Sequence, residues 1–143
     1  MNKDEIFEIL YGKEKVDIYK KFQELEKEAN NSSKLYEHFD SIKCMLLDDR
    51  SYIKLRGFRI ICALSKCDKD NKIDESLDLL LNVLYDDKPT IVRQCMQCLP
   101  ILIKNKANLS EKIKTGVKKI DYMKYKDSMS PLIKKDIENI LDL

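Results

Sequence analysis

The sequence has no tryptophan, one histidine, and only three glycines and three prolines among its 143 residues. Turns rich in glycine and proline connect the strands of most all-β proteins, so this scarcity argues against a β-sandwich or a β-barrel. The glycines are also too few for phosphate-binding or nucleophile loops, and none of the patterns G-x-x-x-x-G-K-[ST], G-x-G-x-x-G or G-x-S-x-G occurs. We therefore expect a protein that is not an enzyme and needs no cofactor.

The chain also lacks a long apolar run. No stretch approaches the roughly 20 apolar residues that cross a bilayer, and acidic residues stand near the amino terminus where a signal peptide would be basic. The five cysteines are odd in number and are not spaced like a disulfide framework. These features predict a reduced, cytoplasmic protein that does not contact a membrane.

Charged residues are abundant, at 36% of the chain, and both signs are mixed, which is typical of amphipathic helices. The apolar residues recur at helical spacing, as Ile18, Phe22, Leu25 and Ala29 illustrate, and sustained two-residue alternation is absent. The sequence therefore predicts an all-α protein. The eight expected helices cover residues 4–12, 13–29, 34–49, 51–66, 73–87, 89–104, 111–126 and 130–143.

Several residues predict where helices begin or are interrupted. Ser130 is expected to cap the last helix with Pro131 in its first turn, and Asn108 and Ser110 are cap candidates for the helix before it. Pro100 falls inside a helical pattern, where it removes a backbone hydrogen bond, so we expect a bend or a break there.

An internal repeat is visible in the second half of the chain. An aliphatic–basic pair recurs as Leu55-Arg56, Val92-Arg93 and Ile133-Lys134. An acid precedes each basic residue by seven positions, at Asp49, Asp86 and Asp127. Inward-facing residues follow each pair at helical spacing. A repeat of about 40 residues in a helical chain is typical of stacked helix pairs, which bury their apolar faces against one another.

These stretches resemble the HEAT repeat, in which the second helix of each pair carries V-R-x-x-A-x-x-A-L-like residues. "IVRQCMQCL" is the closest match, "KLRGFRIICAL" is a fair one, and "LIKKDIENIL" is degraded. The resemblance implies one domain over residues 1–143, an α-α superhelix with a capping helix pair at 1–31 and repeats at 34–67, 72–105 and 108–143. It also implies that the second helices line a concave, partner-binding side.

Cys95 and Cys98 form a C-x-x-C pair, a pattern that can bind metal or cycle between thiol and disulfide. Residues three apart share one face of a helix, so both cysteines are expected to point inward with Val92 and Leu99 as small apolar side chains. Zinc needs about four ligands, and no second C-x-x-C or H-x-x-x-H occurs. We expect a structural role and no metal site, and a metal or redox role of the two cysteines is the alternative.

The remaining candidates for chemistry have structural interpretations. His38 is the only histidine, so a nucleophilic triad has little support, and we interpret it as a partly exposed helix residue. The acid pairs Asp48-Asp49 and Asp86-Asp87 recur before successive helices, so we interpret them as features of helix starts and not as acid–base or metal sites.

The C-terminal part is basic. Residues 104–143 carry ten basic and six acidic side chains, and tyrosines stand among the lysines of 104–126. Lysines with aromatic neighbours can bind nucleic acid. A solvated lysine-rich face is the simpler interpretation. The residues of the alternative nucleic-acid patch are Lys112, Lys114, Lys118, Lys119 and Lys126.

Together these features predict a non-catalytic scaffold that binds another protein or peptide. Polar side chains of the second helices that do not face the core would fix how the partner is aligned, and neighbouring apolar atoms would contribute affinity. The predicted partner-binding residues are Arg59, Gln94, Gln97, Lys134, Lys135 and Glu138.

Overall fold

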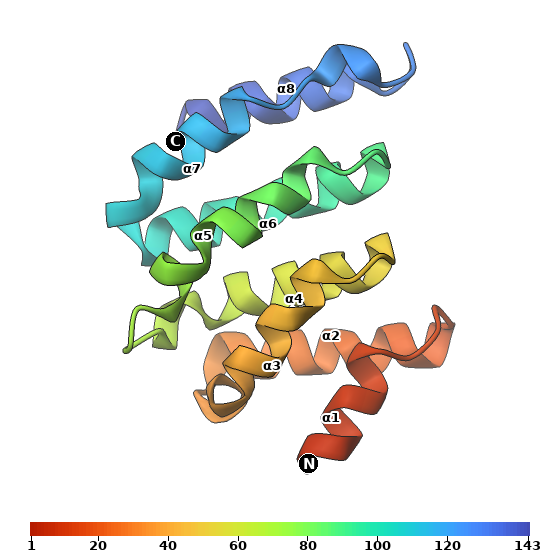
Figure 1. Ribbon diagram of the computed structural model, residues 1–143, viewed down its shortest axis with the longest axis vertical. Coiled ribbons are helices and arrows are strands. Elements are labelled where there is room, and N and C mark those ends of the chain that lie inside the picture. Colours follow the sequence, from red (N-terminus) through yellow and green to blue (C-terminus); the bar gives the residue numbers. More distant parts are fainter.

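The computed structural model describes residues 1–143 and contains eight α-helices and no strand (Figure 1). This confirms the predicted all-α class with about eight helices. Short 3₁₀ turns extend several of the helices. The helices are α1 (Lys3–Leu10), α2 (Val16–Asn31), α3 (Phe39–Cys44), α4 (Ser51–Ala63), α5 (Lys72–Asn82), α6 (Pro89–Asn105), α7 (Ser110–Lys118) and α8 (Ser130–Leu141). None of them combines the length and the apolar character needed to cross a membrane.

Consecutive helices form pairs, and the pairs stack in chain order. The second helices pack directly on one another, α2 on α4, α4 on α6 and α6 on α8, so they make one continuous layer. The first helices α1, α3, α5 and α7 lie in front of that layer in Figure 1, and the two chain termini lie at opposite ends of the stack. We call α2, α4, α6 and α8 the second-helix layer.

Helix α4 is the centre of the stack and is buried on almost every side. Its buried residues include Leu55, Ile60 and Ile61, which point to different sides of the helix. Gly57 lets the preceding segment approach closely, because a Cβ atom at this position would lie 2.8 Å from the Cβ of Met45. The absence of a side chain at this position therefore determines how tightly α3 and its 3₁₀ extension pack on α4.

Two acids hold the starts of second helices, and in the first repeat the acid lies one residue before the predicted one. The Asp48 carboxylate accepts the Arg50 backbone N–H at 2.9 Å, and Asp86 accepts the Lys88 N–H at 2.8 Å. The equivalent acids are therefore Asp48 and Asp86. Asp49, which was aligned with Asp86 in the sequence, is exposed and makes no such bond. The third predicted acid, Asp127, is exposed and makes no such bond either.

The same bonds make these carboxyl groups more acidic. Hydrogen bonds from the Arg50 side chain and backbone lower the pKa of Asp48 to about 2. Burial opposes ionisation of Asp86, but hydrogen bonds from Lys88 N–H, Lys54 and Ser51 outweigh it and lower its pKa. Lys54 and Ser51 belong to α4, so Asp86 also joins two neighbouring pairs.

Three predicted capping residues act differently from expectation. Helix α8 already includes Ser130, whose hydroxyl contacts the Met123 sulfur at 3.9 Å instead of capping the helix. The Asn108 amide donates to Asp74 at 2.8 Å, and Ser110 makes no capping bond to α7. Helix α6 continues through Pro100 to Asn105, so of the bend or break expected at the proline, the break does not occur. At Ser130 and Asn108 a contact with another segment replaces the expected cap.

We expect the two helical glycines to respond differently to alanine. Gly57→Ala would place a methyl group against the Met45 Cβ, which is fixed to the backbone, so the free energy of unfolding should fall by about 1–3 kcal/mol. Gly116→Ala would meet the Leu81 Cδ1 at 3.0 Å, and that methyl can rotate away. The gain in helix propensity should then leave the free energy of unfolding within about 1 kcal/mol of the native value. Urea denaturation of both variants checks this, and equal effects would contradict the close-approach argument.

Candidate functional site

The second-helix layer contains a groove of about 520 Å³ that crosses α2, α4 and α6. It includes two of the six predicted partner-binding residues, Arg59 and Gln94. The groove is lined by Glu14, Lys15, Val16, Tyr19, Phe22, Tyr52, Leu55, Arg56, Arg59 and Gln94. We call it the α2–α4 groove.

Helical spacing explains why these side chains meet. On α2, Val16, Tyr19 and Phe22 follow one another at steps of three. On α4, Tyr52, Leu55 or Arg56, and Arg59 repeat in the same way. Side chains three or four residues apart share a helix face, so each helix presents one stripe to the groove. Val16 is 71% exposed and Tyr19 is 51% exposed, which leaves apolar surface open at the mouth of the groove.

Arg59 is tied to α2 by a two-point ion pair. Its Nε and Nη2 each lie 2.7 Å from a carboxylate oxygen of Glu26, and its guanidinium lies 5.0 Å from the Phe22 ring centre. Hydrogen bonds to Glu26 raise the pKa of Arg59 further. Its Nε and Nη2 are therefore occupied by Glu26, and Arg59 stabilises the packing of α2 on α4 in addition to lining the groove.

Arg56 lies deeper and has no acidic partner. It is 7% exposed, and its Nη1 donates to the carbonyl oxygens of Leu10 at 2.9 Å and Gly12 at 2.6 Å. Burial lowers the pKa of this guanidinium, and the nearby Glu14 carboxylate opposes this shift without forming a salt bridge. Its Cζ lies 5.0 Å from the centre of the Tyr52 ring. Arg56 therefore holds the turn between α1 and α2 through neutral acceptors, and its charge is not neutralised by contact.

The other four predicted partner-binding residues lie elsewhere on the layer. Gln97 is exposed and lines a separate depression of about 280 Å³ between α6 and α8. Lys134, Lys135 and Glu138 are exposed on α8, and Lys134 lies 5.8 Å from the Tyr122 ring centre, beside the first-helix side of the last pair. The six predicted partner-binding residues therefore lie in three places: the α2–α4 groove, the depression between α6 and α8, and the exposed surface of α8.

Reasoning from the sequence missed the groove residues Lys15, Val16, Tyr19 and Tyr52. A signal for two of them exists, because Val16 and Tyr19 are apolar but fall off the inward stripe of α2. Arg56 bonds to carbonyl groups of the preceding helix pair. Arg93, its counterpart in the repeat, instead binds the following pair, with its Nε 2.8 Å from Asp136 of α8.

Cys95 and Cys98 face inward as expected, although to different depths. Cys95 is completely buried with Val92 and Leu99, and Cys98 is half-buried. Burial raises the pKa of Cys98 to about 11 and raises that of Cys95 well above its ordinary value. All five cysteines are free thiols, and nowhere do three or more His, Cys, Asp or Glu side chains gather in a way that could hold a metal ion.

His38 and the acid pairs make local contacts. The His38 Nε2 lies 3.3 Å from Glu37, and its ring meets Phe7 edge to face. The second acids of the two pairs, Asp49 and Asp87, are exposed, whereas the first acids are bound at helix starts. This arrangement agrees with the structural interpretation of the acid pairs.

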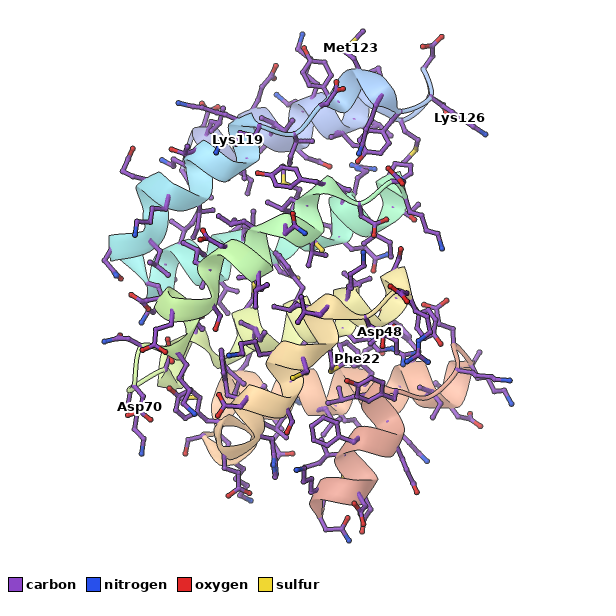
Figure 2. The ribbon with its side chains drawn as sticks, viewed as in Figure 1. Phe22, Asp48, Asp70, Lys119, Met123 and Lys126 are labelled. Carbon is purple, nitrogen blue, oxygen red and sulfur yellow. The ribbon has the colours of Figure 1, made fainter.

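The five lysines of the alternative nucleic-acid patch do not form one surface. Lys112 and Lys119 line a hollow of about 440 Å³ between α5 and α7, together with the acids Asp78 and Glu111. Lys114 binds the Leu143 carbonyl oxygen, and Lys118 is exposed. Figure 2 shows Lys119 and Lys126 well apart along the last pair. The lysines are therefore scattered, and acids stand among them.

The ion pair between Arg59 and Glu26 should contribute to stability, unlike a surface pair. A double-mutant cycle of Arg59→Gln and Glu26→Gln is expected to give a coupling free energy of about 1 kcal/mol, because both side chains are mostly buried and the contact is two-point. The control cycle, Lys124→Gln with Asp87→Asn, involves an exposed pair 3.5 Å apart and should show no measurable coupling. Urea denaturation provides the free energies, and similar coupling in both cycles would contradict this role.

Thiol reactivity should separate Cys44 from the other cysteines. Cys44 is exposed, whereas burial raises the pKa of Cys62, Cys67, Cys95 and Cys98. At pH 8 a disulfide reagent is expected to modify one thiol quickly and four only after unfolding, since the thiolate is the reactive form. Cys44→Ser should remove the fast phase. A fast phase that persists in this variant and disappears in Cys98→Ser would support the redox alternative.

Comparisons of the chain with models of known families, with curated proteins and with solved structures found no match. The HEAT resemblance therefore stays a prediction that rests on the repeated residues. Any function must be argued from the surfaces described above, and the α2–α4 groove is the one in which open apolar side chains and unneutralised charge lie together.

Proposed function

We propose that this protein is a non-catalytic, HEAT-like scaffold that binds another protein or peptide in the cytoplasm through its second-helix layer. The observation that carries the proposal is the continuous packing of α2, α4, α6 and α8, which places polar and apolar side chains from four helices on one layer. Rigid helices hold such side chains in fixed positions, so a partner meets a surface that needs little ordering.

The composition of this layer supports the proposal. It presents Tyr19, Gln97 and Lys135 to solvent, together with the apolar Val16 and Ile101. Tyrosine and arginine are enriched where proteins bind one another, because each combines apolar area with a hydrogen-bonding group. The first-helix layer, in comparison, offers hollows lined mainly by charged and amide side chains.

Substitutions on the second-helix layer are expected to abolish partner binding. The variant Gln97→Glu/Lys135→Glu changes two exposed side chains on α6 and α8 and should retain the fold. Tagged protein would be used for affinity capture from a host lysate, split into nuclease-treated and untreated halves. A protein retained by the native chain in both halves and lost with this variant is the expected result.

The matched control is Lys43→Glu/Asn82→Glu, which makes the same charge changes on α3 and α5. If both variants lose the partner, the effect is one of net charge and the assignment of the second-helix layer is wrong. If the captured proteins disappear after nuclease treatment, the lysine-rich C-terminal region and nucleic-acid binding become the better explanation.

A further inference from the structure

We infer that the α2–α4 groove binds an acidic peptide segment, in which one carboxylate contacts Arg56 and an adjacent apolar side chain packs against Val16 and Tyr19. The inference rests on the proposed function, because it names the chemistry of the partner that the second-helix layer would take. It adds a specific site and a specific ligand class to that proposal.

Arg56 is the one arginine of the chain that forms no salt bridge. The chain has four arginines, and Arg50, Arg59 and Arg93 each contact a carboxylate at 2.9 Å or less. Arg56 is the exception, and it is 7% exposed. Glu14 lies in the same groove and interacts with Arg56 electrostatically, but it forms no salt bridge with it. Removing a guanidinium from water without a contacting carboxylate is unfavourable, so a ligand carboxylate would supply the direct ion pair that the fold does not.

Arg56 has hydrogen-bond donors that the protein leaves unused. Only the Nη1 of Arg56 is used, for the carbonyl oxygens of Leu10 and Gly12. Its Nε and Nη2 donate to no protein atom. In the same groove, Arg59 uses this pair of atoms, Nε and Nη2, to bind both oxygens of Glu26. Arg56 therefore offers a ligand the two-point contact that Arg59 makes within the protein.

The groove is electrostatically suited to a negative ligand. Helix α2 begins at the groove, and its N-cap residue, Lys15, provides no side-chain acceptor for the first-turn amides. Unpaired amides at the start of a helix favour a negative group. Lys15 adds a positive charge, while Glu14 is the only acid among the lining residues. The groove thus has an excess of positive charge, which is complementary to an acidic segment.

Exposed apolar side chains in the groove favour a peptide over a small inorganic anion. Val16 and Tyr19 are more than half exposed beside the open donors, and Phe22 and Leu55 are buried below them. A small inorganic anion would leave this apolar surface in water. A peptide with an aliphatic residue next to aspartate or glutamate would cover it, and burial of apolar area favours binding.

A titration followed by NMR tests the inference directly. ¹⁵N-labelled protein would be titrated with the peptide acetyl-Gly-Leu-Glu-Leu-Gly-amide, with its glutamine analogue, and with its phosphoserine analogue. The glutamate peptide is expected to shift the Arg56 Nε–Hε signal and the amides of residues 16–19. The glutamine peptide should bind about tenfold more weakly, because it lacks the charge. Equal binding by these two peptides, shifts confined to residues 112–126, or no shifts at all would overturn the inference, and selective binding of phosphoserine would replace it with a phosphopeptide site.

Two rim variants keep the test independent of folding. Lys15→Glu lies in the groove and should weaken binding about tenfold, whereas Lys20→Glu makes the same charge change on an exposed part of α2 outside it and should have less than about a twofold effect. Equal weakening by both would show attraction without a site. Arg56→Lys, with its fold verified by its spectrum, should lose the preference for glutamate over glutamine.

The outcome also remains separate from that of the proposed function. If the peptides fail to bind but Gln97→Glu/Lys135→Glu loses the captured partner, the scaffold proposal stands and the groove assignment fails. If Lys15→Glu alone loses the partner, the groove is the binding site and the α6–α8 surface is not.

Discussion

Each helix pair in this chain leaves apolar side chains on more than one side, so no pair can bury its core without a neighbour. Helix α4 shows the consequence most clearly, since it is covered by α2, α6 and the α3 segment together. Gly57 is needed where Met45 comes closest. The stack is therefore held by burial that is shared between pairs, and disturbing α4 should weaken both of its neighbours.

Polar contacts at the helix ends fix how the pairs align. Asp86 receives hydrogen bonds from Ser51 of the preceding pair and from its own Lys88 N–H. At the other ends of the helices, the buried Lys106 amine lies 3.1 Å from Asp68 and 2.7 Å from Asp74. Apolar burial has no direction, whereas these bonds specify one alignment of each pair on the next. The rigid second-helix layer depends on both.

The helices and most of the core could be predicted from the sequence because each depends on local periodicity. The register of the recurrent acids could not, since Asp48 and Asp49 are adjacent and only the hydrogen bond to Arg50 N–H distinguishes them. The groove could not be predicted either, because its residues come from three helices, and the local sequence pattern does not specify how those helices pack on one another. Arg56 binds the carbonyl oxygens of Leu10 and Gly12 and no carboxylate. This choice of acceptors depends on how the turn after α1 packs against α4, which the residues around Arg56 do not reveal.

The contrast between Arg56 and Arg59 links stability to binding. The two residues are one turn apart on α4 and line the same groove, yet Arg59 is bound by the Glu26 carboxylate, whereas Arg56 contacts only carbonyl oxygens and has Glu14 nearby without a salt bridge. A carboxylate placed beside Arg56 within the chain would stabilise the fold and close the groove to an acidic ligand. Leaving it out keeps the fold somewhat less stable and leaves the guanidinium able to discriminate between charged and neutral ligands. Specific recognition requires such an unpaired group, because a site already satisfied by the protein gains nothing from the ligand.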